Sequence, residues 1–213
     1  MARQKFAVTP GFEVGGTLFR PEQLAMLGAI IGEDARVEMT TFKQLYVEMD
    51  EDRVEEAKVK LETVGLQVHP SGFVSKSLIT CNFCRGAEDA GLDVAAMLDE
   101  VIADHPVPNP LKIGYAGCAL GTSEPLLKDI AVIKMRDSYD IYVGGEPRGL
   151  KAALAKPLHT GLSPEMLAPT ILKLITIYQE TGKKKEKFSR FVDRITLEKL
   201  RELTRYEQSA HTG

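Results

Sequence analysis

The sequence predicts an α+β fold in which a small N-terminal unit of strands and helices precedes a second unit of strands that ends in helices. Strand-like and helix-like segments alternate up to about residue 70, buried-strand patterns gather between residues 111 and 145, and helical periodicity fills most of the chain from residue 163 onward. With 213 residues the chain can bury a core without disulfides or metals, either as one large domain or as two small ones.

The N-terminal unit is expected over residues 1–75. Its predicted order is strand with turn, helix, strand, strand, helix and strand, at residues 11–18, 21–31, 35–42, 43–49, 55–64 and 66–69. Pro21 begins the first helix and Gly32 ends it, while Asp50 or Asp52 is the expected cap of the second. This order is the split β-α-β pattern, so residues from about 11 to 70 are predicted to form a ferredoxin-like half-domain.

The second unit is expected over residues 76–213. A strand at 77–80 runs into Cys81, a helix follows over 92–102, and a buried strand at 111–117 leads to Cys118. The remaining predicted elements are strands at 130–135 and 139–145, a helix at 163–182 and further helices over 188–194 and 196–206. This half is therefore predicted to be α/β with a helical C-terminal tail.

Composition and charge limit the cellular locations and binding partners expected of the protein. Three cysteines leave one unpaired in any disulfide scheme, and two of them form a C-x2-C pair too close for an ordinary structural bridge, which favours a reducing cytoplasm. No apolar run approaches the roughly 20 residues needed to span a bilayer, and the first residues lack the apolar core of a secretory signal. A net charge of −3 gives no general attraction to nucleic acid.

The cysteine spacing is the main chemical signal. Cys81 and Cys84 form a close pair, Cys118 follows after 33 intervening residues, and each is expected where a strand meets a loop or helix. Such thiolates can bind neighbouring irons of one iron–sulfur cluster, and glycines at 86, 117 and 121 would let backbone N–H groups approach the sulfurs. Two other interpretations remain: three unrelated thiols, or a zinc site completed by His105 or His69.

The segment over residues 114–145 resembles the cluster-and-haem segment of the sulfite and nitrite reductase family. Cys118 after a glycine, the pair Asp129-Ile130, and the ending from Tyr139 to Gly145 match that family's pattern. Cys81 and Cys84 fall where the family has its first cysteine pair, although that pair is usually more widely spaced. Residues 20–30 and 37–47 also resemble the family's half-domain, so the resemblance covers most of the chain.

The resemblance implies a siroheme whose iron shares a cysteine with a 4Fe-4S cluster, an electron-donor protein, and a small inorganic anion as substrate. In this family one active unit contains two half-domains, so a single copy implies a homodimer. Thr122 stands at the family's fourth cysteine position. A hydroxyl is a poor substitute for a thiolate, so the cluster is expected to lose an iron to become 3Fe-4S, to accept an oxygen ligand from residues 122–124, or to leave one iron open.

The residues that handle the anion in the family are also altered here. Phe42 stands in place of an arginine and is followed by Lys43. Of two expected lysines only Lys112 remains, because Pro110 occupies the other position. Lys76 falls where the family has an arginine, and it is expected to be either a solvated lysine on a strand or an anion-binding group that lacks the bidentate fork of arginine. The resemblance thus points to Lys43, Lys76 and Lys112 as anion-binding groups.

Two further features concern cofactor and partner. Arg148, just after two glycines, is a candidate for binding a tetrapyrrole carboxylate. The basic run at 183–187 could dock an acidic electron donor, or it could be a solvated helix end. The leading prediction is an iron–sulfur redox protein of the sulfite and nitrite reductase type. The alternatives are an iron–sulfur carrier or sensor without siroheme, and a zinc-stabilised binding module.

Overall fold

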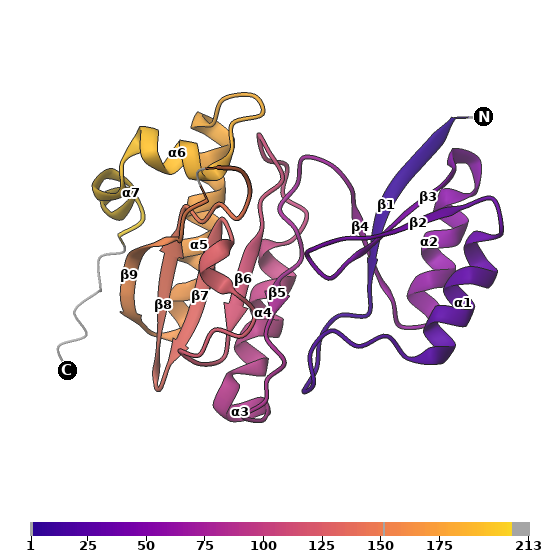
Figure 1. Cartoon of the computed structure of the whole chain (residues 1–213), viewed down its shortest axis with the longest axis horizontal. Helices are drawn as coiled ribbons and strands as arrows, with labels where there is room; N and C mark the ends of the chain where they lie inside the picture. Colours follow the sequence, from indigo (N-terminus) through magenta and orange to yellow (C-terminus); the bar gives the residue numbers. More distant parts are fainter. Residues whose placement is uncertain (1, 151, 206–213) are drawn as a thin grey trace.

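The computed structural model describes residues 2–150 and 152–205, which form two lobes, each with its own sheet (Figure 1). The first lobe is built on a four-stranded sheet and the second on a five-stranded sheet. The predicted α+β fold is confirmed. The sheets fall on either side of the expected boundary at residues 75 and 76, and the boundary itself stays a prediction.

The first lobe is an antiparallel sheet of order β2-β3-β1-β4 with two helices packed against one of its faces. Its elements are β1 (Arg3–Thr9), α1 (Pro21–Ile31), β2 (Arg36–Met39), β3 (Leu45–Asp50), a 3-10 turn (Glu51–Arg53), α2 (Val54–Thr63) and β4 (Gln67–Pro70). Alternate residues of β1, such as Phe6 and Val8, are buried against apolar side chains of α1 and α2. The order strand, helix, strand, strand, helix, strand, with both helices on one face of the sheet, makes a split β-α-β unit.

Two expectations for this lobe are wrong. The first strand is Arg3–Thr9, not residues 11–18, where the backbone makes only an isolated bridge between Glu13 and Gly16. Glycines in the left-handed region occupy that stretch and offer no side chains to a sheet, whereas residues 3–9 pair with β3 and β4 and residues 6–9 are buried. No side-chain cap comes from Asp50 or Asp52, because a 3-10 turn precedes α2 and Arg53 occupies the N-cap position.

The second lobe is a mixed sheet of order β5-β6-β7-β8-β9. Strands β5, β6 and β7 run parallel, and β8 and β9 continue the sheet antiparallel. The elements are β5 (Ile79–Thr80), α3 (Ala87–Ala90), α4 (Leu92–Ile102), β6 (Ile113–Ala116), a 3-10 turn (Pro125–Leu127), β7 (Ile130–Met135), β8 (Ser138–Val143), β9 (Lys156–Leu162), α5 (Pro164–Thr181), α6 (Phe188–Ile195) and α7 (Leu197–Leu203). Helices α4 and α5 pack together, and apolar residues of both share one buried cluster with the central strands.

The helical tail is confirmed within the described residues, and the expected end of its last helix at 206 lies outside them. Strand β9 was missed because Pro157 and Gly161 interrupt any alternating apolar pattern. Its strand state comes from pairing with β8 across two register shifts. Within residues 2–150 and 152–205, no helix is long and apolar enough to cross a membrane.

Candidate functional site: the cysteine loops and the lysine groove

The three cysteines lie in two neighbouring loops at the same end of the second sheet. Cys81 directly follows β5 and Cys118 follows β6, and because these strands are parallel their carboxyl ends meet at one edge. Cys81, Cys84, Cys118 and Thr122 all line one small cavity between the loops. The structure therefore brings together the residues that the sequence spacing singled out.

Backbone contacts hold the two loops against each other. The N–H of Gly117 donates to Cys81 Sγ at 3.3 Å, and the N–H of Cys81 donates to the Tyr115 carbonyl at 3.0 Å. A side chain at position 117 would have no room, because a Cβ there would lie 2.5 Å from Ala90 Cβ and 2.7 Å from the Ala90 carbonyl oxygen. An N–H aimed at a cysteine sulfur is the kind of second contact that iron–sulfur clusters receive, so these loops fit such a cluster.

Burial differs among the three cysteines. Cys81 is buried, Cys118 is half-buried and Cys84 is exposed, and all three are free thiols. The loop that carries Cys81 and Cys84 is fixed from the other lobe, since Phe83 stacks on Phe12 and the Gly15 N–H donates to the Asn82 carbonyl at 2.9 Å. The stretch predicted as the first strand thus supports the cysteine loop instead.

The arrangement does not resemble a single-ion site. In the part of the chain that the structure describes, no three His, Cys, Asp or Glu side chains are grouped closely enough to hold one metal ion. The two histidines considered as a fourth zinc ligand lie elsewhere: His105 Nε2 contacts the Val101 carbonyl at 2.8 Å and His69 Nδ1 contacts Asp104 at 2.9 Å. A structural zinc ion needs four ligands at about 2.0–2.3 Å, which this arrangement does not offer.

Thr122, predicted to stand at the position of a fourth cluster ligand, is exposed and lines the cavity. Of the two neighbouring oxygen donors, Ser123 is already engaged, because its hydroxyl donates to the Tyr115 carbonyl at 2.9 Å. Glu124 is exposed and has a left-handed backbone. Thr122 is therefore the best placed of the three oxygen donors, because it lines the cavity with the cysteines.

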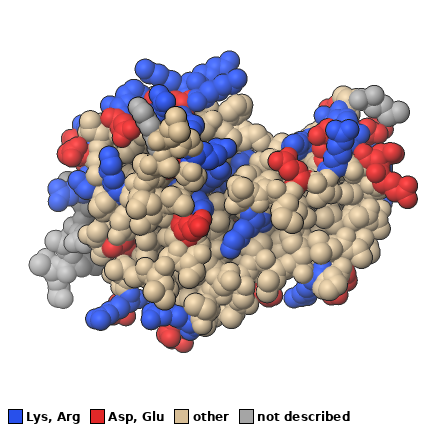
Figure 2. All heavy atoms as spheres, in the orientation of Figure 1, with Lys and Arg blue, Asp and Glu red and all other residues tan. Residues whose placement is uncertain are grey.

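A second group of residues lies where the two lobes meet, a junction that we call the lysine groove, because contacts between the lobes bring Lys43, Lys76 and Lys112 there. Figure 2 shows basic side chains in the middle of the face that it draws. Lys43, in the β2–β3 turn, donates its ammonium to the Thr80 carbonyl at 2.7 Å, next to Cys81. Partial burial lowers the pKa of Lys43, although the nearby Cys81 thiol opposes this effect. Lys43 therefore connects the first lobe directly to the cysteine loop.

Lys76 is almost fully buried, with 2% of its surface exposed. Its ammonium donates to the Gly72 carbonyl at 3.0 Å and lies 5.7 Å from the centre of the Tyr46 ring. Burial lowers the pKa of Lys76 to about 8, partly opposed by the Asp104 carboxylate. None of the ion pairs found within residues 2–150 and 152–205 includes Lys76, and burial of a lysine charge without an ion pair is costly.

Lys112 lies on the same groove, 5.5 Å from the centre of the Phe42 ring. Phe42, which the resemblance predicts to stand in place of an arginine, thus contacts a lysine ammonium in a cation–π arrangement. Burial lowers the pKa of Lys112, and the nearby positive charge of Arg148 lowers it further. Arg148 itself is exposed, and its N–H donates to Glu146 at 3.1 Å.

Lys128 was missed by sequence reasoning. Burial lowers its pKa, and its charge acts on both Lys43 and Lys112. Its stem crosses β6 where Gly114 leaves room, since a Cβ there would lie 2.8 Å from Lys128 Cγ. The adjacent Asp129 carboxylate accepts the Lys112 N–H at 2.8 Å, and burial raises the pKa of Asp129 to about 7. No sequence pattern marks Lys128, because only the strand order brings it to the groove.

Two of the lysines lie at one end of strands β5 and β6, and two of the cysteines lie at the other end. Lys76 precedes β5 and Lys112 precedes β6, whereas Cys81 and Cys118 follow these strands. The four residues of β6 alone span roughly 13 Å at the usual rise per residue. Lys76 and Lys112 therefore do not sit over the cysteine cavity of their own chain.

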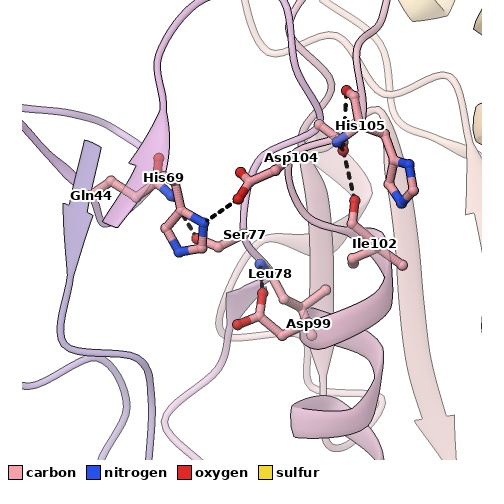
Figure 3. A network of polar contacts seen from close by, with 9 residues as sticks. Gln44, His69, Ser77, Leu78, Asp99, Ile102, Asp104 and His105 are labelled. Carbon is pink, nitrogen blue, oxygen red and sulfur yellow. Dashed lines mark hydrogen bonds and ion pairs between the residues drawn. The ribbon is translucent and has the colours of Figure 1, made fainter. Parts of the chain in front are cut away.

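Polar contacts fix the two lobes relative to each other near Lys76 (Figure 3). The His69 ring of β4 contacts Asp104 at 2.9 Å, and the Gln44 amide donates to the Ser77 hydroxyl at 2.6 Å. On the second lobe, Asp99 accepts the Leu78 N–H at 2.6 Å. The first two bonds cross the junction between the lobes and the third holds the second lobe's side of it, so together they fix the surroundings of the groove lysines.

Comparison with known proteins agrees with this geometry. Residues 77–211, more than half of the chain, match a family model described as "Nitrite and sulphite reductase 4Fe-4S domain". Among solved structures, the chain is similar to the Mycobacterium tuberculosis NirA protein, with a TM-score of 0.70 and 14% identity over 95% of this chain and 39% of that one. It is also similar to dissimilatory sulfite reductase I, with a TM-score of 0.72 and 13% identity over 99% and 71% of the two chains. At these identities the structural matches show the fold alone.

Curated relatives are similar at the sequence level. A cobalt-factor III methyltransferase of Priestia megaterium is 24% identical over 89% of this chain and 34% of its own length. An assimilatory-type sulfite reductase of Nitratidesulfovibrio vulgaris is 24% identical over 56% of this chain and 54% of its own length. An assimilatory nitrate reductase electron transfer subunit of Bacillus subtilis is 26% identical over 63% of this chain and 17% of its own length. This chain thus spans about a third of the length of the methyltransferase and about half of the length of the sulfite reductase.

Proposed function

Since the chain belongs to the nitrite and sulphite reductase 4Fe-4S domain family, we propose that it is an iron–sulfur redox protein that transfers electrons to sulfite or nitrite held on a siroheme. When bound, the cluster would supply electrons one at a time and the siroheme would hold and reduce the anion. The observation that carries the proposal is the single cavity lined by all three cysteines and Thr122. Cys81, Cys84 and Cys118 would bind iron through their thiolates.

The groove lysines support an anionic substrate. Lys43, Lys76, Lys112 and Lys128 all have pKa values lowered by burial, and several of them repel one another. Such a group is destabilised until a negative charge enters it, so a small oxyanion is a suitable ligand. Arg148, exposed at the rim near Lys112, would contact a carboxylate of the tetrapyrrole.

The same geometry supports a homodimer. Because Lys76 and Lys112 lie at the strand ends opposite the cysteines, a site that needs both groups is better built from two copies. A closed two-fold dimer is the commonest way to do so, and it would place the lysines of one chain opposite the cluster of its partner.

A second candidate is an iron–sulfur electron carrier or sensor without siroheme. The exposed Thr122 at the fourth position favours it, because a neutral hydroxyl would not bridge a cluster to a haem iron. The match to a protein named as an electron transfer subunit is compatible with this candidate. A zinc-stabilised module has less support, since neither His69 nor His105 lines the cysteine cavity. The free thiols support our placement of either redox protein in a reducing cytoplasm.

An absorption spectrum of anaerobically purified protein separates these candidates. Siroheme gives a Soret band with a visible band toward the red, a cluster alone gives a broad shoulder, and zinc gives neither. Single alanine variants provide the matching test of the ligands, and each should lose iron and sulfide: Cys81→Ala, Cys84→Ala and Cys118→Ala. Unchanged iron and sulfide in all three variants would refute the cluster assignment.

The dimer is tested by light scattering and by complementation. We expect twice the mass of one chain in solution with cofactor bound. Mixed dimers of Cys118→Ala and Lys76→Met chains should regain part of the anion-reducing activity that each variant lacks alone, because one of their two sites has both intact halves. A monomer by light scattering, or no regained activity in mixed dimers, would contradict a shared site.

A further inference from the structure

A hollow of about 1010 Å³ opens directly beside the cysteine loops. Residues 117–120 line one side of it, including Cys118, and Arg85 lies next to Cys84 on another side. The β7–β8 turn provides the remaining wall, because β6 and β7 are parallel and end at the same edge of the sheet. Cys118 also lines the cavity shared with the other two cysteines, so the hollow is the outer side of the candidate cluster site.

The walls of the hollow combine positive charge with apolar surface. Leu120 is 80% exposed and Met135 is 40% exposed. The charged lining residues are basic at Arg85, Lys134 and Arg136 and acidic at Asp89 and Asp137. None of the ion pairs found within residues 2–150 and 152–205 involves Arg85 or Arg136. Both guanidinium groups are therefore available to an outside partner.

The basic run at 183–187, the donor site considered from the sequence, lies at the other end of the molecule. The Lys185 N–H donates to the carbonyl of Pro108, which precedes β6, and the run joins α5 to α6. Figure 1 shows α6 at the opposite end of the second lobe from α3, which lies next to the cysteine loops. Part of the run is also engaged within the chain, because Lys187 pairs with Glu146 at 2.7 Å. Electron transfer weakens steeply with distance, so this run is poorly placed to dock a donor.

We propose that the hollow beside Cys118 is the docking surface of a small acidic electron-carrier protein. This inference rests on the proposed function, since it assigns the source of the cluster's electrons. One electron would pass from the reduced carrier to the oxidised cluster, which leaves the carrier oxidised. Arg85 and Arg136 attract the acidic carrier, while Leu120 and Met135 provide the apolar centre of a small, short-lived interface.

Charge reversal tests the surface in the full-length protein with its cofactor. The test variant is the double substitution Arg85→Glu with Arg136→Glu, and the matched control is Lys183→Glu with Lys184→Glu, two exposed lysines of the other basic run. Stopped-flow absorption follows cluster reduction by a reduced acidic ferredoxin and, separately, by dithionite. Titration calorimetry follows ferredoxin binding, which does not depend on electron transfer.

We expect the test variant to lose at least about tenfold in reduction rate and affinity at low salt, since steering by charge changes association rates on the order of 10- to 1000-fold. The difference should shrink at high salt, and the dithionite rates and the control should remain near wild type. An unchanged ferredoxin rate and affinity in the test variant, or a larger loss in the control, would overturn the proposal. A protein that binds ferredoxin through this hollow but contains no cluster would overturn the proposed function and leave the docking surface standing.

Discussion

Lys76→Met should make the protein more stable at neutral pH while it weakens anion binding. Burial lowers the pKa of Lys76 from 10.5 to about 8, and this difference corresponds to about 3 kcal/mol of unfavourable free energy for the charged form. Methionine fills a similar volume without charge. It loses the hydrogen bond to the Gly72 carbonyl, worth about 1 kcal/mol, which leaves a net gain of about 2 kcal/mol.

The gain should depend on pH in a defined direction. Between about pH 8 and pH 10.5 the unfolded chain binds a proton at Lys76 that the folded chain does not, so wild-type stability rises with pH across this window. The methionine variant lacks this rise. The cost of the buried charge should therefore fall by about half between pH 7 and pH 9.5. The difference in the free energy of unfolding between Lys76→Met and the wild type should become smaller over the same range.

Paired thermal unfolding of the cofactor-loaded proteins measures both effects. For a chain of this size, about 2 kcal/mol corresponds to a rise in Tm of about 4–8 °C at pH 7. The control is Lys60→Met, because Lys60 is exposed and pairs with Glu56 on the surface of α2, where ion pairs contribute about 0–1 kcal/mol. If Lys76→Met lowers Tm at pH 7, or if its effect is the same at pH 9.5, Lys76 is not a destabilising buried charge.

Two predictions concern the cysteine loops. Thr122→Cys should increase the iron content, because a thiolate binds iron far better than a hydroxyl; if siroheme is present, electron paramagnetic resonance should show stronger coupling between haem and cluster. Equal iron and equal spectra in both proteins would mean that another residue fills this position. Gly117→Ala should lower iron retention and cost about 1–3 kcal/mol, since its Cβ would collide with Ala90, whereas the exposed Ala119→Ser should change neither. Full iron content in Gly117→Ala would show that the loops can separate without loss of the cluster.

The amino-acid sequence by itself determined the elements whose pattern is local. The helices α1, α4 and α5 and the strands β6, β7 and β8 carry periodic apolar residues with turn residues at their ends, so each could be predicted from its own segment. The three cysteines were also evident from their spacing and from their places next to predicted strands, whereas Thr122 was singled out only through the resemblance to the sulfite and nitrite reductase family.

Only the tertiary structure decided the features that depend on distant neighbours. Strand β9 has no alternating pattern and exists because β8 offers it hydrogen bonds, and the glycine-rich stretch before α1 supports the cysteine loop instead of joining the sheet. Lys76 was expected to be either solvated or functional, and its burial comes from packing between the lobes. The position of a side chain relative to the cysteines depends on strand order and direction. Short-range sequence patterns do not specify strand order or direction, so they did not predict that Lys128 lies near the other lysines. For the same reason, the separation of Lys76 and Lys112 from the cysteines is evident only from the fold.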